Sequence, residues 1–141
     1  MKKNKDSRRN FLKKSVVLPS IMILPRHVLG GKGFISPSDK LNIAGIGVRK
    51  WGMGANNLSQ CRNENIVALC DVDQKQAAPT YKKYPKAKVY NDYRIMLEKQ
   101  KDIDAVIVAT PDHNHAVITM LAMKMGKHVY CQKPLTRTHY E

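Results

Sequence analysis

The sequence predicts an α/β fold with a doubly wound parallel sheet. After residue 40, short apolar segments alternate with segments of helical pattern, which indicates right-handed βαβ units. The segment Ile103–Ala109 is an almost continuous apolar, β-branched run, typical of a central parallel strand buried on both faces. A Gly-x-Gly sequence, Gly45–Gly47, directly follows the first apolar segment. These observations predict an open sheet that binds ligands along one edge.

Five strands are expected, each a short apolar run. They are Leu41–Ile46, Ile66–Cys70, Lys88–Tyr90, Ile103–Ala109 and His128–Cys131. Helices are expected between and after these strands. They are Gly52 to about Cys61, Gln74–Lys83, Asp92–Lys99, Pro111–Met125 and a last helix that begins at Leu135.

Local signals support these helices. Thr110 is expected as an N-cap with Pro111 at the first helical position, and Gly126 as the end of the same helix. Pro85 closes the second helix. Two sets of side chains are expected to face the core. They are Ile95, Met96 and Leu97 in the third helix, and Val117, Ile118, Leu121, Ala122 and Met125 in the fourth.

The first thirty-one residues are expected to be an export signal. Ser7–Lys13 reads S-R-R-x-F-L-K and matches a twin-arginine motif, after a basic start and before an apolar run too short to span a bilayer. A basic amphipathic helix is the alternative, but Pro19 and Pro25 interrupt it. We therefore expect a signal over residues 1–31, a linker over 32–40, export by the twin-arginine machinery and a periplasmic or other extracytoplasmic location.

The net charge of +14 does not by itself indicate nucleic-acid binding. Half of it lies in residues 1–31, and the remaining basic residues are scattered without interleaved aromatic residues. A solvated lysine surface is expected, with no nucleic-acid partner. The three cysteines form neither a disulfide framework nor a zinc motif.

Polar groups follow the expected strands at one edge. They are the glycine loop (residues 45–54), Asp71, Thr110–His115 and Gln132–Pro134. Gly45 permits a tight turn, and Gly47 lets backbone N–H groups approach a phosphate at the start of a helix. Gly-x-Gly alone is equally consistent with a structural turn.

Asp71 favours the ligand-binding alternative. It lies 24 residues beyond Gly47 at the end of the second strand, where a carboxylate accepts hydrogen bonds from ribose hydroxyls. The order of strand, loop, helix, strand and acid predicts a dinucleotide site. A carboxylate repels a 2′-phosphate, and no arginine closely follows Asp73. NAD is therefore expected as the cofactor, rather than NADP.

Four ordered motifs carry a family resemblance. "KLNIAGIG…GMGANNL", "VALCDVD", "AVIVATPDHNHA" and "GKHVYCQKPLT" together resemble the N-terminal domain of the Gfo/Idh/MocA, or glucose–fructose oxidoreductase, family. The resemblance covers residues 39–141 and implies a Rossmann-like dinucleotide-binding domain over 41–141. It also implies a C-terminal α/β substrate domain, which this chain would lack as a truncated form.

The family's Glu-Lys-Pro motif corresponds here to Gln132, Lys133 and Pro134. The resemblance implies that Lys133 reaches toward the nicotinamide and the substrate and assists proton transfer or positioning. An ammonium group beside a reacting hydroxyl also stabilises developing negative charge on general grounds, whereas a surface lysine is the alternative. Gln132 keeps hydrogen-bonding capacity but lacks the carboxylate.

The segment after the fourth strand is expected to line the same cleft, through Thr110, Pro111, His113 and His115 together with Gln132 and Pro134. Local capping or packing is the alternative for the two histidines. A metal site is not expected, because residues two apart on a helix point in different directions and no third ligand is evident.

The glycine loop departs from the family pattern. Secreted members have G-I-G-V-G-G-M-G, whereas Arg49 and Lys50 form a two-residue insertion here and Trp51 replaces a glycine. Gly52 and Gly54 match the last two glycines. The insertion either adds positive charge near a pyrophosphate or hinders loop closure, and hindrance is expected. A third possibility is that the charges lie in solvent while Trp51 packs over the loop.

The resemblance implies the cofactor half of an exported NAD(P)-dependent oxidoreductase. It would act by hydride transfer on a sugar or cyclitol hydroxyl of a carbohydrate-like substrate, as a homo-oligomer when full length, and would not be active alone. Two alternatives remain. One is an NAD-dependent glycosidase of the same family, and the other is a non-catalytic nucleotide-binding or assembly module.

Overall fold

The computed structural model describes residues 30–31 and 35–140. The chain divides into two compact units, Met1–Ser36 and Pro37–Glu141. The twin-arginine motif lies outside the described residues, and the fold below is that of the second unit. Where the sequence predicts a linker, a short 3₁₀ turn, η1 (Pro37–Asp39), precedes the first strand.

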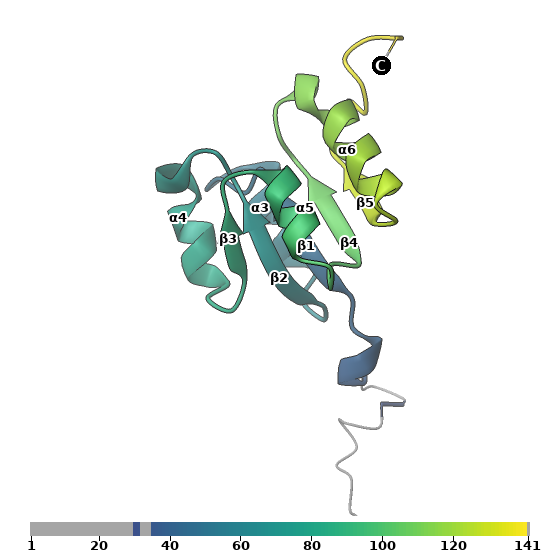
Figure 1. Cartoon of the computed structure of the whole chain (residues 1–141). Coiled ribbons are helices and arrows are strands. Elements are labelled where there is room, and N and C mark those ends of the chain that lie inside the picture. Colours follow the sequence, from purple (N-terminus) through teal and green to yellow (C-terminus); the bar gives the residue numbers. More distant parts are fainter. Residues whose placement is uncertain (1–29, 32–34, 141) are drawn as a thin grey trace, which may run out of the picture. The chain divides into compact units, whose positions relative to one another are not determined.

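The second unit is built on a five-stranded sheet in which every pairing is parallel (Figure 1). The strands are β1 (Asn42–Ile46), β2 (Asn65–Cys70), β3 (Lys88–Tyr90), β4 (Ala105–Val108) and β5 (His128–Cys131). Their spatial order is β3-β2-β1-β4-β5. The order reverses between β1 and β4, which is where an open α/β sheet forms its ligand crevice. The predicted fold class is confirmed.

Helices cover both faces of this sheet. They are α3 (Met53–Gln60), α4 (Gln74–Lys83), α5 (Tyr93–Lys99) and α6 (His115–Lys124). Helices α5 and α6 pack on one face, with Ala44 and Val106 beneath them, and α3 and α4 pack on the other (Figure 1). All strands run the same way because each connecting helix crosses one face of the sheet and returns the chain to the same edge. The first two connections, through α3 and α4, use one face, and the last two, through α5 and α6, use the other.

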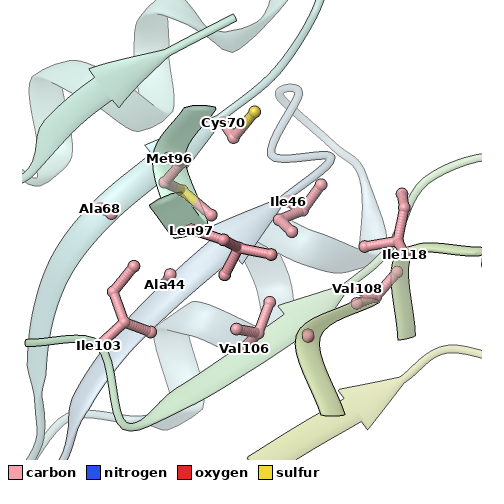
Figure 2. Packing of buried hydrophobic residues seen from close by; sticks show 11 residues of the cluster. Ala44, Ile46, Ala68, Cys70, Met96, Leu97, Ile103, Val106, Val108 and Ile118 are labelled. Atoms are coloured by element: carbon pink, nitrogen blue, oxygen red, sulfur yellow. The ribbon is translucent and has the colours of Figure 1, made fainter. Parts of the chain in front are cut away.

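Alternation along the strands fills two cores. In β1, Ile46 belongs to the cluster under α5 and α6, whereas Ile43 belongs to the cluster under α3 and α4. Figure 2 shows the first cluster, in which Met96 and Leu97 of α5 meet strand residues such as Ile46 and Val106. Burial on both faces explains why the central strands are almost purely apolar in sequence.

Two helix predictions need correction. Thr110 is not an N-cap, because Pro111 is extended and a 3₁₀ turn, η2 (Asp112–Asn114), precedes α6, whose N-cap is Asn114. Residues 135–140 form no helix, and Leu135 is exposed there. With Leu135 exposed, these residues pack no apolar face that would offset the cost of helix nucleation.

Two predicted inward side chains face solvent instead. Ile95 and Val117 are exposed, whereas Met96, Leu97 and Ile118 are buried. Each helix meets the sheet along a stripe narrower than the run of apolar residues in its sequence, so the residues at the edge of the run stay outside. Within the described residues, no helix is long and apolar enough to cross a membrane.

Candidate functional site at the carboxyl edge of the sheet

The four predicted groups meet at the carboxyl edge of the sheet. Backbone hydrogen bonds continue the strand ladders into the loops: Gly47 N–H donates to the Cys70 carbonyl at 2.9 Å, and Gln132 N–H donates to the Val108 carbonyl at 2.9 Å. Asp71 N–H donates to the Tyr90 carbonyl at 3.2 Å. The loops are therefore fixed where their strands end, and their polar groups share one edge.

The turn after β1 has no room for a side chain. Gly47 has φ +80°, and a Cβ placed there would lie 2.5 Å from the Ala109 carbonyl oxygen and 2.9 Å from the Thr110 nitrogen. Only glycine fits both the positive φ and this close approach of two loops. The predicted importance of Gly47 thus has a steric basis, because the loops after β1 and β4 touch through it.

Gly54 is a residue that the predicted site omits. A Cβ there would lie 2.1 Å from the Gly47 carbonyl oxygen, so α3 packs directly on the turn. Gly52 is the N-cap of α3, and a Cβ at Gly45 would meet Leu58 and Val48 side chains at 2.8 Å. Gly54 is the second residue of α3. A glycine at this position of a helix is the signal that could have identified it, because the missing side chain lets the helix approach the turn after β1.

Asp71 holds the glycine loop from the end of β2. Its Oδ2 accepts the Val48 N–H at 2.8 Å, and its Oδ1 accepts the Asp73 N–H at 3.0 Å. The residue is half-buried, and a carboxylate has about four acceptor positions. Two acceptor positions of the Asp71 carboxylate therefore remain.

Two neutral groups surround this carboxylate. Burial raises the pKa of Cys70 to about 12, with further contributions from the charges of Asp71 and Asp92. Burial also raises the pKa of Tyr81 to about 12, and the Asp71 charge acts in the same direction. The thiol and the phenol stay protonated at neutral pH, so neither supplies a competing anion beside Asp71.

The residues present fit a dinucleotide on two observations. Thr110 Oγ1 is buried and has no hydrogen-bond partner among the described residues, directly beside Gly47. An orphaned hydroxyl at the edge of a site is a hydrogen-bonding group that a bound ligand can satisfy. The first-turn amides of α3, Met53–Ala55, are those that a helix leaves without intrahelical partners, and they suit a phosphate.

His115 connects two of the predicted groups from inside the fold. It is buried, its Nε2 lies 2.8 Å from the Thr110 carbonyl oxygen, and its Nδ1 lies 2.6 Å from the Pro134 carbonyl oxygen. Both ring nitrogens face backbone oxygens, so the side chain holds the loops after β4 and β5 together. This placement favours the packing alternative for His115 over direct contact with a ligand.

The remaining predicted residues are accessible. His113, Pro111 and Lys133 are exposed and Gln132 is half-buried. The Lys133 side chain therefore stands free at the end of β5, next to the segment that His115 holds. Three or more metal-binding side chains do not gather anywhere in the described part of the chain.

Trp51 does not pack over the glycine loop. Its side chain is 87% exposed, so that part of the third possibility is wrong. Arg49 and Lys50 are exposed, as the same possibility expected. A separate hollow, lined by residues including Asn42, Asn65 and Gln100, lies at the amino ends of β1 and β2. That edge is opposite to the one where parallel sheets bind ligands.

The decisive comparison is with the family described as "Oxidoreductase family, NAD-binding Rossmann fold", whose sequence model matches residues 41–141. The chain belongs to this GFO_IDH_MocA family. The matched residues coincide with the sheet and its carboxyl-edge loops, so the unit described above is an NAD-binding Rossmann domain.

Individual relatives agree. An inositol 2-dehydrogenase of Salmonella typhimurium is 34% identical over 104 residues, which cover 70% of this chain and 30% of the relative. A glycosyl hydrolase family 109 protein of Stenotrophomonas maltophilia is 29% identical, over 89% of this chain and 29% of the relative. The crystal structure of a myo-inositol 2-dehydrogenase from Lactobacillus plantarum superposes with a TM-score of 0.64 at 26% identity, covering 72% of this chain and 30% of that one. This chain thus spans about 30% of the length of these relatives.

Proposed function

We propose that residues 41–141 bind NAD at the carboxyl edge of the sheet and act as the cofactor half of an oxidoreductase. The enzyme would transfer hydride from the hydroxyl-bearing carbon of a sugar or cyclitol to the nicotinamide, or back to the corresponding ketone carbon. This proposal rests on one observation: the loops after β1 and β4 meet at Gly47. The orphaned Thr110 hydroxyl and the Asp71 carboxylate lie next to this contact. The names of the relatives, which include inositol dehydrogenases, supply the substrate class.

Each residue has a distinct part in this proposal. The bound nicotinamide supplies the hydride acceptor or donor. Asp71 accepts hydrogen bonds from the adenosine ribose, and the first turn of α3 faces the pyrophosphate. Lys133, exposed at the end of β5, accepts the hydroxyl proton during oxidation or donates a proton to the oxygen during reduction. Gln132 donates or accepts a hydrogen bond beside it.

His115 acts through backbone groups rather than on a ligand. By facing the Thr110 and Pro134 carbonyl oxygens it fixes the spacing of the loops after β4 and β5. Lys133 lies next to Pro134 in the chain, so the spacing of the two loops fixes the position of the backbone from which the Lys133 side chain extends. His115 thereby fixes the backbone at Thr110 and at Lys133 relative to each other.

Calorimetric titration of the chain with NAD and with NADP tests the binding step. We expect NAD to bind more tightly, because Asp71 repels a 2′-phosphate. Binding of neither dinucleotide, or a preference for NADP, contradicts the proposal.

A chimera tests the chemical step. Residues 41–141 replace the matching segment of the related Salmonella inositol 2-dehydrogenase, and NADH formation from inositol is measured. We expect activity that Lys133→Ala removes while NAD affinity stays within about threefold, because Lys133 acts on the substrate. Full activity of the Lys133→Ala chimera contradicts its role. A chimera that binds NAD but never turns over favours a non-catalytic nucleotide-binding module.

The glycosyl hydrolase relative supports a second candidate, an NAD-dependent glycosidase. Its match covers 89% of this chain, against 70% for the inositol dehydrogenase. A second chimera, with the remainder of that relative, distinguishes the two. Glycoside cleavage that requires NAD without net NADH formation favours the glycosidase.

Export by the twin-arginine machinery is also part of the proposal, and Arg8 and Arg9 carry it. Replacing both by lysine should retain the protein in the cytoplasm, because the export receptor distinguishes the arginine pair. Cell fractionation of wild type and double variant gives the answer, and unchanged periplasmic delivery contradicts it.

A further inference from the structure

The insertion in the glycine loop forms a turn with an unusual backbone. Gly52 N–H donates to the Arg49 carbonyl at 3.0 Å, which closes a four-residue turn. Within it Trp51 has φ +63° and is the one non-glycine residue of the described chain with a positive φ. A bulky side chain is rarely found in this left-handed region because of steric strain. Gly or Asn would fit the position without it.

Two tethers place this turn beside the end of β2. Val48 N–H donates to the Asp71 carboxylate at 2.8 Å, and Lys50 N–H donates to the Gln76 carbonyl in the first turn of α4 at 2.9 Å. The insertion therefore lies on the side of the site where Asp71 is proposed to hold the adenosine ribose. Lys133 follows β5, three strand spacings from β2, or roughly 14 Å.

The indole at the tip of this turn is accessible and has an oriented neighbour. Trp51 is 87% exposed, and Lys50 Nζ lies 5.0 Å from the centroid of its ring. At this separation the ammonium group covers one face of the ring by a cation–π contact. With so little of the side chain buried, the other face is open. The indole therefore contributes little to the core, although its backbone is strained.

We infer that Trp51 is the stacking platform for the adenine ring of the dinucleotide, with Lys50 on the opposite face of the indole. This inference rests on the proposed NAD site and adds a residue to it. Adenine, rather than nicotinamide, is the occupant because the platform is tethered to Asp71 and α4 and lies far from Lys133. Stacking of a base on an aromatic side chain strengthens binding by about tenfold.

Trp51 is the only tryptophan of the chain, so its emission reports on this site directly. Titration of the 141-residue chain with NAD and with 5′-ADP should quench the emission, whereas nicotinamide mononucleotide should not. Quenching by neither adenine nucleotide, at concentrations where calorimetry shows NAD bound, overturns the inference and leaves the proposed function intact. Absence of NAD binding overturns both.

Substitutions separate stacking from backbone geometry. Trp51→Gly relieves the strained φ and removes the ring, and it should weaken NAD binding about tenfold by calorimetry. Trp51→Phe keeps a ring and should retain most of the affinity. Affinity of Trp51→Gly equal to or above that of wild type overturns the inference.

A third variant restores the family spacing by deleting Arg49 and Lys50 and changing Trp51 to Gly. It decides between this inference and the hindrance of loop closure that the sequence predicts. Weaker NAD binding by the repaired loop supports the platform. Tighter or equal binding contradicts it.

Discussion

The glycine loop and the Thr110–Pro134 region build the two halves of one site by opposite means. At Gly47 and Gly54 the backbone itself makes the contacts, and a Cβ at either position would overlap a carbonyl oxygen. Between Thr110 and Pro134 a buried imidazole fills the space and faces two backbone carbonyls. One half is fixed by the absence of side chains, the other by the presence of one.

This difference predicts how each half responds to change. Adding atoms damages the glycine loop, because its backbone segments are already in contact. Removing atoms damages the other half, because the imidazole contacts to two backbone segments are lost and a void forms. The predictions below test this contrast, beginning with the largest expected effect.

Gly47→Ala should destabilise the fold by about 2–5 kcal/mol, from overpacking together with a positive φ. Gly126→Ala is the matched control. Gly126 also has a positive φ, +73°, but no atom lies within 4 Å of its Cβ position. A destabilisation of about 1–2 kcal/mol is therefore expected. Urea unfolding measures both free energies. Equal losses would show that φ, and not the loop contact, governs Gly47.

His115→Ala should cost about 2–4 kcal/mol of unfolding free energy, since it removes a buried ring and a hydrogen bond to a backbone carbonyl. His113→Ala, at an exposed position two residues earlier, should stay within about 0.5 kcal/mol. Thermal unfolding of the two variants compares them. A His115 variant as stable as the His113 variant would remove the contrast between the two halves.

Asp71→Ala should weaken NAD binding about tenfold, because a hydrogen bond to a charged group is lost. It should also narrow the preference for NAD over NADP, since the charge that repels a 2′-phosphate is gone. Asp71 also accepts a hydrogen bond from Val48 N–H, so damage to the loop should lower the affinities for NAD and for NADP alike. The ratio of the two affinities therefore reports the effect of the Asp71 charge alone. Asp102→Ala, at an exposed position at the opposite, amino edge of the sheet, is the control. An unchanged ratio in Asp71→Ala would argue against ribose recognition.

Alkaline pH should loosen the core beneath Asp71. Burial raises the pKa of Cys70 from 9.0 to about 12, so above pH 9 the unfolded chain loses this proton more readily than the folded one. Stability from this group is fully present below pH 9 and declines as pH rises toward 12. Cys70→Ala should flatten that decline, whereas Val108→Ala, in the same cluster, should not. Parallel pH profiles of the two variants would contradict the assignment.

Much of the fold was predictable because its signals are local. Strands β3 and β5 and helix α4 have the predicted bounds, since an apolar run or an acidic cap such as Asp73 marks them along the chain. The failures are equally specific. Thr110 looked like an N-cap, but the extended Pro111 delays the helix by a 3₁₀ turn. Ile95 and Val117 were expected inside, and only helix docking decides which edge of an apolar run is covered.

The sequence by itself determined the order of strands and helices, the glycine loop, and the acid at the end of β2, because each depends on residues close together in the chain. Tertiary structure alone decided that Gly54 is as constrained as Gly47, that His115 turns inward to join two loops, and that the Trp51 side chain is exposed to solvent. These facts depend on which backbone segments meet across the sheet edge. Sequence periodicity does not predict contacts between these loops, because the contact distances are set by packing between elements far apart in the chain.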